Sequence, residues 1–175
     1  EQEARDTARE IQALGVKAWT VQGDQGDRHR AAQIFDDAVA QAGPIDILIN
    51  SASIFPKSHL DTFTWEDLES NIHVNAFGPL VLARAFAAQQ REGSLLNFLD
   101  SRMCDYDRDH AAYHLSKRMF YTLTRMMALE YAPRITVNAI APGPVLPPPG
   151  ESQDYLERMA QYLSLIHISE PTRLR

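Results

Sequence analysis

The chain has 175 residues, a formal net charge of −6, 45% hydrophobic residues and 23% charged residues, which suits one globular domain of ordinary composition. The negative charge without a basic stretch argues against a nucleic-acid partner, and no apolar run approaches the roughly 20 residues that a membrane-spanning helix needs. The single cysteine, Cys104, excludes an internal disulfide framework and suits a reducing cytoplasm, where we expect the protein to act.

The two ends of the chain differ from the rest. The N-terminal stretch EQEARDTARE is charged and has a helical pattern, so it is not a signal peptide, and it opens in mid-helix. From Ser164 the stretch SLIHISEPTRLR breaks the preceding helical pattern with an Ile-His-Ile run and Pro171. It resembles a translated sequencing adapter. We therefore expect residues 1–163 to form a partial domain and residues 164–175 to be a non-native tail.

The first part of the chain alternates helical and extended patterns. An apolar stripe predicts an amphipathic helix over residues 1–14. Residues 16–21 have the pattern of a strand, with Asp24 in the turn at its end. A second helix is predicted over residues 28–42, and a short apolar run over 45–49 is typical of a buried parallel strand.

The second part of the chain continues the alternation. It is predicted to contain a helix over residues 64–90, a strand over 94–99, a helix that carries Tyr113 and stops at Ala132-Pro133, a strand over 135–140, and a helix over 151–163. Thr64 is the expected N-cap of the first of these helices, because acidic residues occupy its first turn. The pair Gly78-Pro79 is expected to interrupt that helix.

Strands that alternate with long helices indicate an α/β fold with a parallel sheet, right-handed crossovers and helices on both faces. Ligands of such sheets bind beyond the carboxyl ends of the strands. Four polar or proline-rich loops follow the predicted strands: GDQGD, NSASIFPKS, DSRMCDYDRD and PGPVLPPPG. We therefore expect the functional site at this edge of the sheet.

Three side chains at this edge predict a proton-transfer site. Tyr113 and Lys117 are four residues apart in a helical pattern, so they lie on one face, one turn apart. Asp100 stands where the strand over 94–99 gives way to a loop. A phenol is a weak acid with a reference pKa near 10, and an ammonium within about 4–6 Å favours the phenolate. The pair can therefore move a proton at neutral pH.

Four motifs in this order resemble those of the short-chain dehydrogenase/reductase family, over about residues 1–163. They are Asn50-Ser51-Ala52-Ser53, Asn75, the pair Tyr113 and Lys117, and Asn138-Ala139-Ile140-Ala141-Pro142-Gly143. The resemblance implies a Rossmann-type doubly wound parallel sheet that lacks the family's first two strands, their glycine-rich turn and the last strand. We therefore expect the 175-residue chain by itself to fold poorly and to be inactive; soluble expression with NADPH binding would contradict this.

The resemblance also implies roles for individual residues. It implies catalytic roles for Asn75, Asp100, Tyr113 and Lys117, with Asn75 holding a water for proton relay. It implies that the cofactor contacts Asp24, Asn50, Ala52, Ser53, Tyr113, Lys117, Pro142, Gly143 and Val145. NADPH is the expected cofactor. NADH stays open, because the second strand of the family, whose end selects between the two, is absent from the sequence.

Two departures from the family pattern bear on the substrate. Most members have a serine thirteen residues before the tyrosine, where this chain has Asp100, and a glycine where it has Ser53. Both departures resemble the pteridine reductase branch, whose members reduce pterins with NADPH. A shift by one position would instead bring Ser101 to the usual serine position, and this alternative stays open.

The favoured function is an NAD(P)H-dependent oxidoreductase that reduces a pterin or dihydrofolate-like substrate. A reductase of ketones or 3-oxoacyl substrates and a non-catalytic cofactor-binding member are the alternatives. By resemblance, the helices over 65–90 and 110–132 pack against other copies in a homodimer or homotetramer. His110 and His114 have the spacing of metal ligands on a helix, but no third ligand is in view, so no metal site is expected.

Each candidate residue also has a purely structural interpretation. Tyr113 and Lys117 could be an exposed pair on a helix, and Asp100 could anchor its loop. Asp24 could be a turn residue, since Gly-Asp pairs are common in turns. Asn75 could be a buried asparagine that bonds to the backbone.

Overall fold

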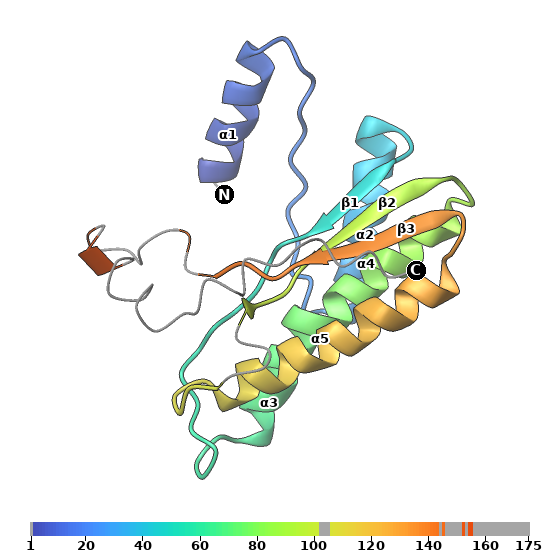
Figure 1. Cartoon of the computed structure of the whole chain (residues 1–175). Coiled ribbons are helices and arrows are strands. Elements are labelled where there is room, and N and C mark those ends of the chain that lie inside the picture. The colour runs from blue at the N-terminus through green and yellow to red at the C-terminus, as the bar shows by residue number, and fades with distance from the viewer. Residues whose placement is uncertain (1, 102–105, 144, 146–151, 153, 156–175) are drawn as a thin grey trace.

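The computed structural model describes residues 2–101, 106–143, 145, 152, 154 and 155 (Figure 1). Its elements, in chain order, are α1 (Gln2–Ala13), α2 (Arg28–Ala42), β1 (Ile47–Asn50), α3 (Trp65–Ile72), the π-helix η1 (His73–Phe77), α4 (Gly78–Ala88), β2 (Gly93–Phe98), α5 (Ala111–Glu130) and β3 (Ile135–Ile140). Most of the predicted helix over 151–163 and the whole tail from Ser164 lie outside the described residues. None of the described helices is long and apolar enough to cross a membrane.

The three strands form one parallel sheet in the order β1-β2-β3, which confirms the predicted α/β fold. Leu48 pairs with Leu95, and Leu95 with Val137, so these three side chains share one face. Figure 1 shows α2, α4 and α5 on the same side of the strands. On the opposite face Ile47 is 63% exposed and Ile49 is 54% exposed. In the described part of the chain the sheet is therefore covered on one face, whereas helices on both faces were expected.

The predicted strand over residues 16–21 is wrong. The structure has no strand there; the backbone runs from α1 toward the sheet without a ladder partner (Figure 1). A strand is defined by hydrogen bonds to a neighbouring strand, and β1 is paired with β2 alone among the described strands. The helix before this segment does form and ends at Ala13, and Gly15 follows with a φ of 82°, which favours glycine. The apolar stripe of α1 has no buried residue.

The predicted helix over 64–90 is three consecutive segments, α3, η1 and α4. The interruption comes just before Gly78-Pro79, where the N–H of Gly78 donates to the carbonyl of His73, five residues back. Pro79 has no N–H, so the regular four-residue pattern could not continue through it. Gly78 is also required by packing, because a Cβ atom there would lie 2.6 Å from the carbonyl oxygen of Gln25.

Thr64 caps α3 as predicted. Its hydroxyl accepts a hydrogen bond from the N–H of Asp67, and the Asp67 carboxylate accepts one from the N–H of Thr64. This reciprocal arrangement satisfies two backbone donors that the first helical turn leaves without partners.

Replacing Thr64 with alanine is expected to lower the free energy of unfolding by about 1 kcal/mol, because the cap of α3 is lost. Urea unfolding followed by circular dichroism measures the effect. Thr62→Ala is the matched control, since Thr62 is exposed and lies outside the capping box. Equal destabilisation by both substitutions would contradict the capping role.

The core lies between the sheet and the helices and fixes the orientation of α5. Phe86 of α4, Leu95 of β2 and Phe120 of α5 belong to one buried cluster. The buried residues of α5 recur three or four positions apart and include Tyr113, Ser116, Lys117, Phe120, Thr124 and Met127. Met127 lies in the core, whereas Met126 is exposed. Tyr113 and Lys117 lie on the buried face of α5, so they are not an exposed surface pair.

Candidate functional site

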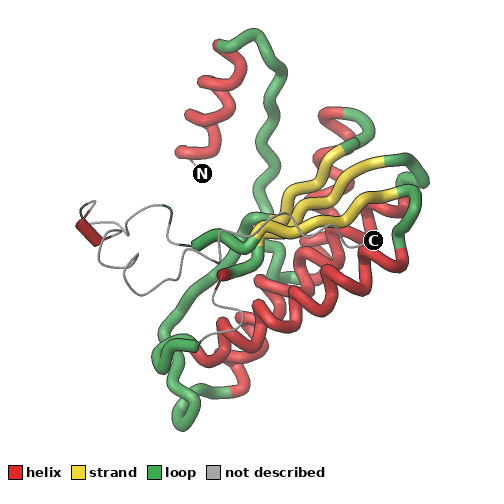
Figure 2. The backbone as a smooth tube through the Cα atoms, viewed as in Figure 1, coloured by secondary structure: helices red, strands yellow, loops and turns green. Residues whose placement is uncertain are grey.

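The loops that follow the three strands leave from the same edge of the sheet (Figure 2). Beyond β2 and β3 the chains stay side by side, because Leu99 N–H donates to the Ile140 carbonyl at 2.8 Å and Ser101 N–H to the Pro142 carbonyl at 3.3 Å. Asp100 lies between these two bonds. The structure therefore brings Asp100 next to the segment that contains Pro142 and Gly143.

The Asp100 carboxylate meets the phenol of Tyr113. The Tyr113 hydroxyl donates to Asp100 Oδ2 at 2.6 Å, a short distance typical of a charge-assisted hydrogen bond. Asp100, thirteen positions before Tyr113, is thus the residue that contacts the tyrosine. Ser101 is the next residue along this edge of the sheet. The catalytic roles of Tyr113 and Asp100 stay predictions, which are taken up under the proposed function.

Lys117 lies one turn after Tyr113 and is buried. Its ammonium donates to the carbonyl of Phe98 at 3.0 Å and lies 5.7 Å from the centre of the Tyr113 ring. Burial lowers the pKa of Lys117, and the negative charge of Asp100 partly opposes this effect. An ammonium group has three donors, so the bond to Phe98 leaves capacity for other acceptors. The positive charge of Lys117 stands where it favours a phenolate on Tyr113.

The lowered pKa of Lys117 predicts a pH-dependent contribution to stability. The unfolded chain releases this proton near the ordinary value of 10.5, and the folded protein releases it at a lower pH. Between these two values the unfolded chain binds more protons, so the contribution of Lys117 to the free energy of unfolding rises with pH. Below the lowered pKa this contribution is constant.

Lys117→Met is expected to remove this pH-dependent contribution, because the variant has no ammonium at this position. The free energy of unfolding of the wild type minus that of the variant should therefore rise toward pH 10.5, with a slope of at most about 1.4 kcal/mol per pH unit. Urea unfolding of both proteins from neutral pH upward measures it. Lys57→Met is the matched control for the loss of a lysine at an exposed position. A flat difference for Lys117→Met would contradict the lowered pKa.

Asn75 joins the loop after β1 to α5. Its amide oxygen accepts from the N–H of Ile54 at 2.8 Å and from the Ser53 hydroxyl at 3.0 Å. Its amide nitrogen donates to the Ile54 carbonyl at 3.0 Å and to the Ser116 hydroxyl at 3.0 Å. η1 contains Asn75, and π-helical turns of this kind are frequent at functional sites. The structure shows the backbone-bonding arrangement; a proton relay through Asn75 stays a prediction.

Asn50 begins a buried polar chain that sequence reasoning missed. Its amide nitrogen donates to Asn97 at 2.9 Å, and Asn97 donates to the Thr124 hydroxyl at 2.9 Å. The side-chain oxygen of Asn50 is buried without a hydrogen-bond partner within the described residues. A buried acceptor of this kind is costly unless a donor reaches it. Its position at the carboxyl end of β1 fits a bound cofactor with hydroxyl groups.

Asp24 has a local structural role. Its carboxylate accepts from the N–H of Gly26 at 2.7 Å, as a turn residue does. The adjacent Gln25 donates to the Val74 carbonyl at 2.8 Å and to the Ala52 carbonyl at 3.3 Å. This segment therefore lies beside the loop after β1, where Ala52 and Ser53 are. The contact of Asp24 with a cofactor stays a prediction.

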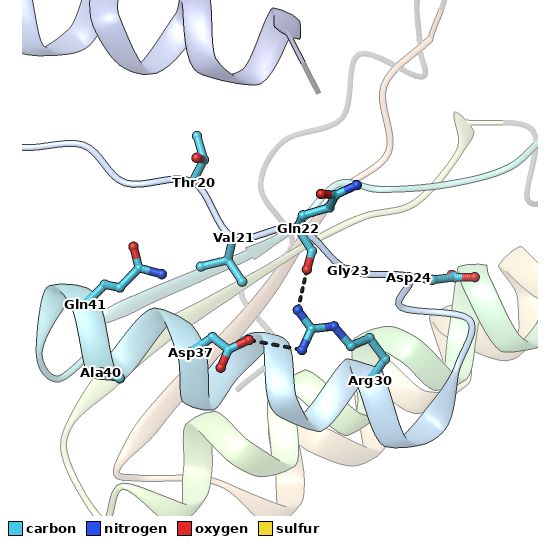
Figure 3. A pocket seen from close by; sticks show the side chains of 9 residues that line it. All are labelled: Thr20, Val21, Gln22, Gly23, Asp24, Arg30, Asp37, Ala40 and Gln41. Carbon is cyan, nitrogen blue, oxygen red and sulfur yellow. Dashed lines mark hydrogen bonds and ion pairs between the residues drawn. The ribbon is translucent and has the colours of Figure 1, made fainter.

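A hollow of about 610 Å³ lies between the extended segment and α2 (Figure 3). Arg30 of α2 bonds to the Gln22 carbonyl and, at 3.1 Å, to Asp37. Asp24 lines this hollow, but none of the residues around Tyr113 does. We therefore place the candidate site at Tyr113, where the polar groups converge. Val145, a further predicted cofactor contact, is exposed.

Phe55 and His110 lie beside the candidate site; sequence reasoning missed Phe55 and considered His110 only as a metal ligand. Phe55 is 54% exposed, and its ring contacts that of Tyr113 edge to face with the centres 4.4 Å apart. The ring of His110 stacks on Phe55 with the centres 3.7 Å apart. Ser58 and His110 form an isolated parallel bridge, which joins the loop after β1 to the start of α5. The signal was the aromatic residue within the polar loop NSASIFPKS.

His110 and His114 contact the same carboxylate. His110 Nδ1 lies 2.8 Å from Asp107 Oδ1, and His114 Nε2 lies 3.4 Å from Asp107 Oδ2. Burial raises the pKa of Asp107, but hydrogen bonds from His110 and from the N–H of Asp109, with the charges of the two histidines, leave it lowered. No group of three potential metal ligands occurs among the described residues.

Known proteins share this sequence pattern and architecture. A family profile described as short chain dehydrogenase matches residues 1–154. Versicolorin reductase 1 from Aspergillus parasiticus is 32% identical over 145 residues, which are 81% of this chain and 55% of that protein. The chain thus spans little more than half the length of the curated relatives it matches.

Many solved structures are similar in fold, and two are described here. FolM alternative dihydrofolate reductase 1 from Brucella canis, complexed with NADP, gives a TM-score of 0.83 at 30% identity; the match covers 94% of this chain and 66% of that one. A blue fluorescent protein from a metagenomic library, in complex with NADPH, gives a TM-score of 0.83 at 28% identity. This match covers 91% of this chain and 67% of that one. The family profile covers most of the chain, and the fold and motif order agree with it. The chain belongs to the short-chain dehydrogenase family.

Proposed function

We propose that this chain is part of a longer NADPH-dependent reductase whose substrate is a pterin or a dihydrofolate-like heterocycle. The observation that carries the proposal is the hydrogen bond of 2.6 Å from the Tyr113 hydroxyl to the Asp100 carboxylate. It couples the phenol of the family's tyrosine to a carboxylate, where most members have a serine hydroxyl.

The proposed roles divide the chemistry between cofactor and protein. NADPH supplies the hydride when it is bound. Tyr113 and Asp100 hold a proton between two oxygen atoms beside the reacting group. Lys117 favours the phenolate that forms when Tyr113 releases this proton. Asn75 holds the loop that carries Ser53 against α5, so that the edge of the site keeps its shape.

The carboxylate favours a heterocyclic substrate over a ketone. Reduction of a C=N bond in a pterin ring leaves a nitrogen that needs a proton, and the ring is basic. A carboxyl group pairs well with such a nitrogen through a charge-assisted hydrogen bond. The exposed ring of Phe55 beside Tyr113 supports the same substrate class, because a planar heterocycle can stack on an aromatic face.

The proposed cofactor site follows the carboxyl edge of the sheet. Asn50 contributes the buried oxygen without a partner among the described residues, and Lys117 contributes an ammonium. The remaining proposed contacts are Asp24, Ala52, Ser53, Tyr113, Pro142, Gly143 and Val145. Both similar structures described above contain NADP or NADPH, which supports NADPH over NADH.

The proposed assembly is a homodimer or homotetramer in the cytoplasm. Exposed apolar side chains on α3 and α5 support it, and they include Trp65, Leu115, Tyr121, Met126 and Leu129. Exposed large apolar side chains are often part of protein interfaces. No nucleic acid or membrane is part of the proposal.

A carbonyl reductase is the second candidate, and the position of Ser101 favours it. Ser101 lies at the same edge and bonds to Pro142 through its backbone. A serine hydroxyl there could steady the developing alkoxide of a ketone or 3-oxoacyl substrate.

NADPH oxidation by the full-length protein, followed at 340 nm, tests the two candidates. The substrates are dihydrobiopterin, dihydrofolate, and a panel of aromatic and aliphatic ketones. We expect turnover of at least one of the two pterins. Turnover of ketones alone would contradict the pterin proposal and favour the carbonyl reductase. NADPH binding without any turnover would favour a non-catalytic member of the family.

A further inference from the structure

The ring of Phe55 is exposed but is held in a defined orientation. Its loop is joined to the start of α5 at Ser58, whose N–H donates to the Asp109 carbonyl at 2.6 Å and whose carbonyl accepts from Ala111 at 2.8 Å. The Ser58 hydroxyl also accepts from the N–H of Ala112 at 3.1 Å. The backbone around Phe55 is therefore fixed relative to the helix that carries Tyr113.

His110 fixes the plane of the Phe55 ring. The two rings are nearly parallel, at 13°, with their centres 3.7 Å apart. The Phe55 ring stands at 81° to the Tyr113 ring. One face of Phe55 is thus covered by the imidazole, and Tyr113 contacts the ring as well; because the side chain is 54% exposed, part of the remaining surface is open to a ligand.

Asp107 in turn fixes His110. A carboxylate only accepts hydrogen bonds, so at 2.8 Å from Asp107 Oδ1 the Nδ1 atom of His110 must carry a proton. Two hydrogen bonds hold Asp107 in place. The N–H of Asp109 donates to Asp107 Oδ1 at 2.9 Å, and the backbone N–H of Asp107 donates to the His114 ring. The order of contacts is Asp107, His110, Phe55 and Tyr113.

We propose that Asp107 and His110 are positioning residues that hold Phe55 as an aromatic wall for planar substrates. They act through Phe55 and take no part in proton transfer. The inference rests on the proposed function for the substrate class, since a planar ring beside Tyr113 is what the wall would recognise. Phe55 contributes binding, and the Tyr113–Asp100 pair contributes chemistry.

The kinetic test compares three variants of the full-length enzyme. His110→Ala is expected to raise KM for dihydrofolate about 3- to 10-fold, the value of one aromatic contact, with kcat unchanged. His110→Phe keeps the stacking and should restore most of the loss. His59→Ala is the matched control. His59 contacts the segment that contains His110, through the Arg108 carbonyl, but it does not stack on Phe55. It should leave KM unchanged.

A parallel pair tests the contribution of Asp107. Asp107→Ala should raise KM as His110→Ala does, whereas Asp107→Asn keeps an acceptor for His110 and should have a smaller effect. If the enzyme reduces ketones and not pterins, the same variants are measured with an aromatic and an aliphatic ketone. The rise in KM should then be confined to the aromatic substrate. In this way failure of the pterin proposal is distinguished from failure of the inference.

A measurement without substrate completes the test. In nuclear magnetic resonance spectra of the free protein, His110→Ala should shift the Phe55 ring protons, because the stacked imidazole no longer contributes its ring current. His59→Ala should not shift them. Unchanged Phe55 resonances in His110→Ala, an equal rise in KM for planar and aliphatic substrates, or a fall in kcat with KM unchanged would each overturn the inference.

Discussion

Tyr113→Phe is expected to lower kcat of the full-length enzyme by about 10²- to 10⁴-fold, the usual contribution of a positioned proton donor. The substitution removes one oxygen atom and keeps the ring, which is buried in α5 and contacts Phe55. The fold should therefore change little, and the affinity for NADPH should fall far less than kcat. Steady-state kinetics with the best substrate and a fluorescence titration with NADPH measure the two effects separately.

Tyr121→Phe is the matched control for this prediction. Tyr121 lies on the same helix, two turns later, and is exposed beside Arg125. It should keep wild-type kcat. A Tyr113→Phe enzyme with near-normal kcat would show that another group supplies the proton. A parallel loss of NADPH binding and of thermal stability would point to a structural role for the phenol.

Asp100→Asn should lower kcat for pterin reduction by about 10²-fold or more, because an amide cannot exchange a proton. The amide still offers an oxygen to the Tyr113 hydroxyl, so the geometry around the tyrosine should survive. Asp100→Ser introduces the residue that most family members have there. It should also lose pterin reduction, but it should keep or gain activity on ketones. The ratio of kcat/KM for dihydrofolate to that for a ketone is the quantity to measure.

Asp61→Asn, on the exposed loop before α3, is the control for a change of charge alone. Pterin reduction that survives both Asp100 substitutions would show that the carboxylate is not the proton donor. The double variant Tyr113→Phe with Asp100→Asn adds a further test. Because the two groups share one hydrogen bond, their effects should be less than additive.

Local patterns predicted most elements correctly. The helix over 28–42 has the observed bounds of α2, and the strand over 135–140 has those of β3. Thr64 was predicted as an N-cap from the acidic residues that follow it, and the capping box is present. These features depend on residues within a few positions of one another, so a single sequence contains the information. The strand over 16–21 failed because a strand also depends on a distant partner.

The candidate site was predicted only in part, because some of its contacts are local in sequence and others are not. Tyr113 and Lys117 lie one helical turn apart, so their shared face follows from spacing. The contact of Asp100 with Tyr113 spans thirteen residues and was expected from the family pattern, with Ser101 as the alternative. Phe55 lies 55 positions before His110, and no periodicity connects them. The chain from Asn50 through Asn97 to Thr124 likewise joins two strands and a helix.

The sequence by itself determined the α/β class, the helices and strands that local patterns can encode, and the candidate residues for proton transfer. The tertiary structure decided which of these residues meet. In the structure the Tyr113 hydroxyl bonds to Asp100 and not to Ser101. Asn75 bonds to both the loop after β1 and α5, and the His110 ring stacks on Phe55. The physical reason is that helical and strand periodicities act over a few residues, whereas hydrogen bonds and ring contacts depend on how the parallel strands bring distant loops to one edge.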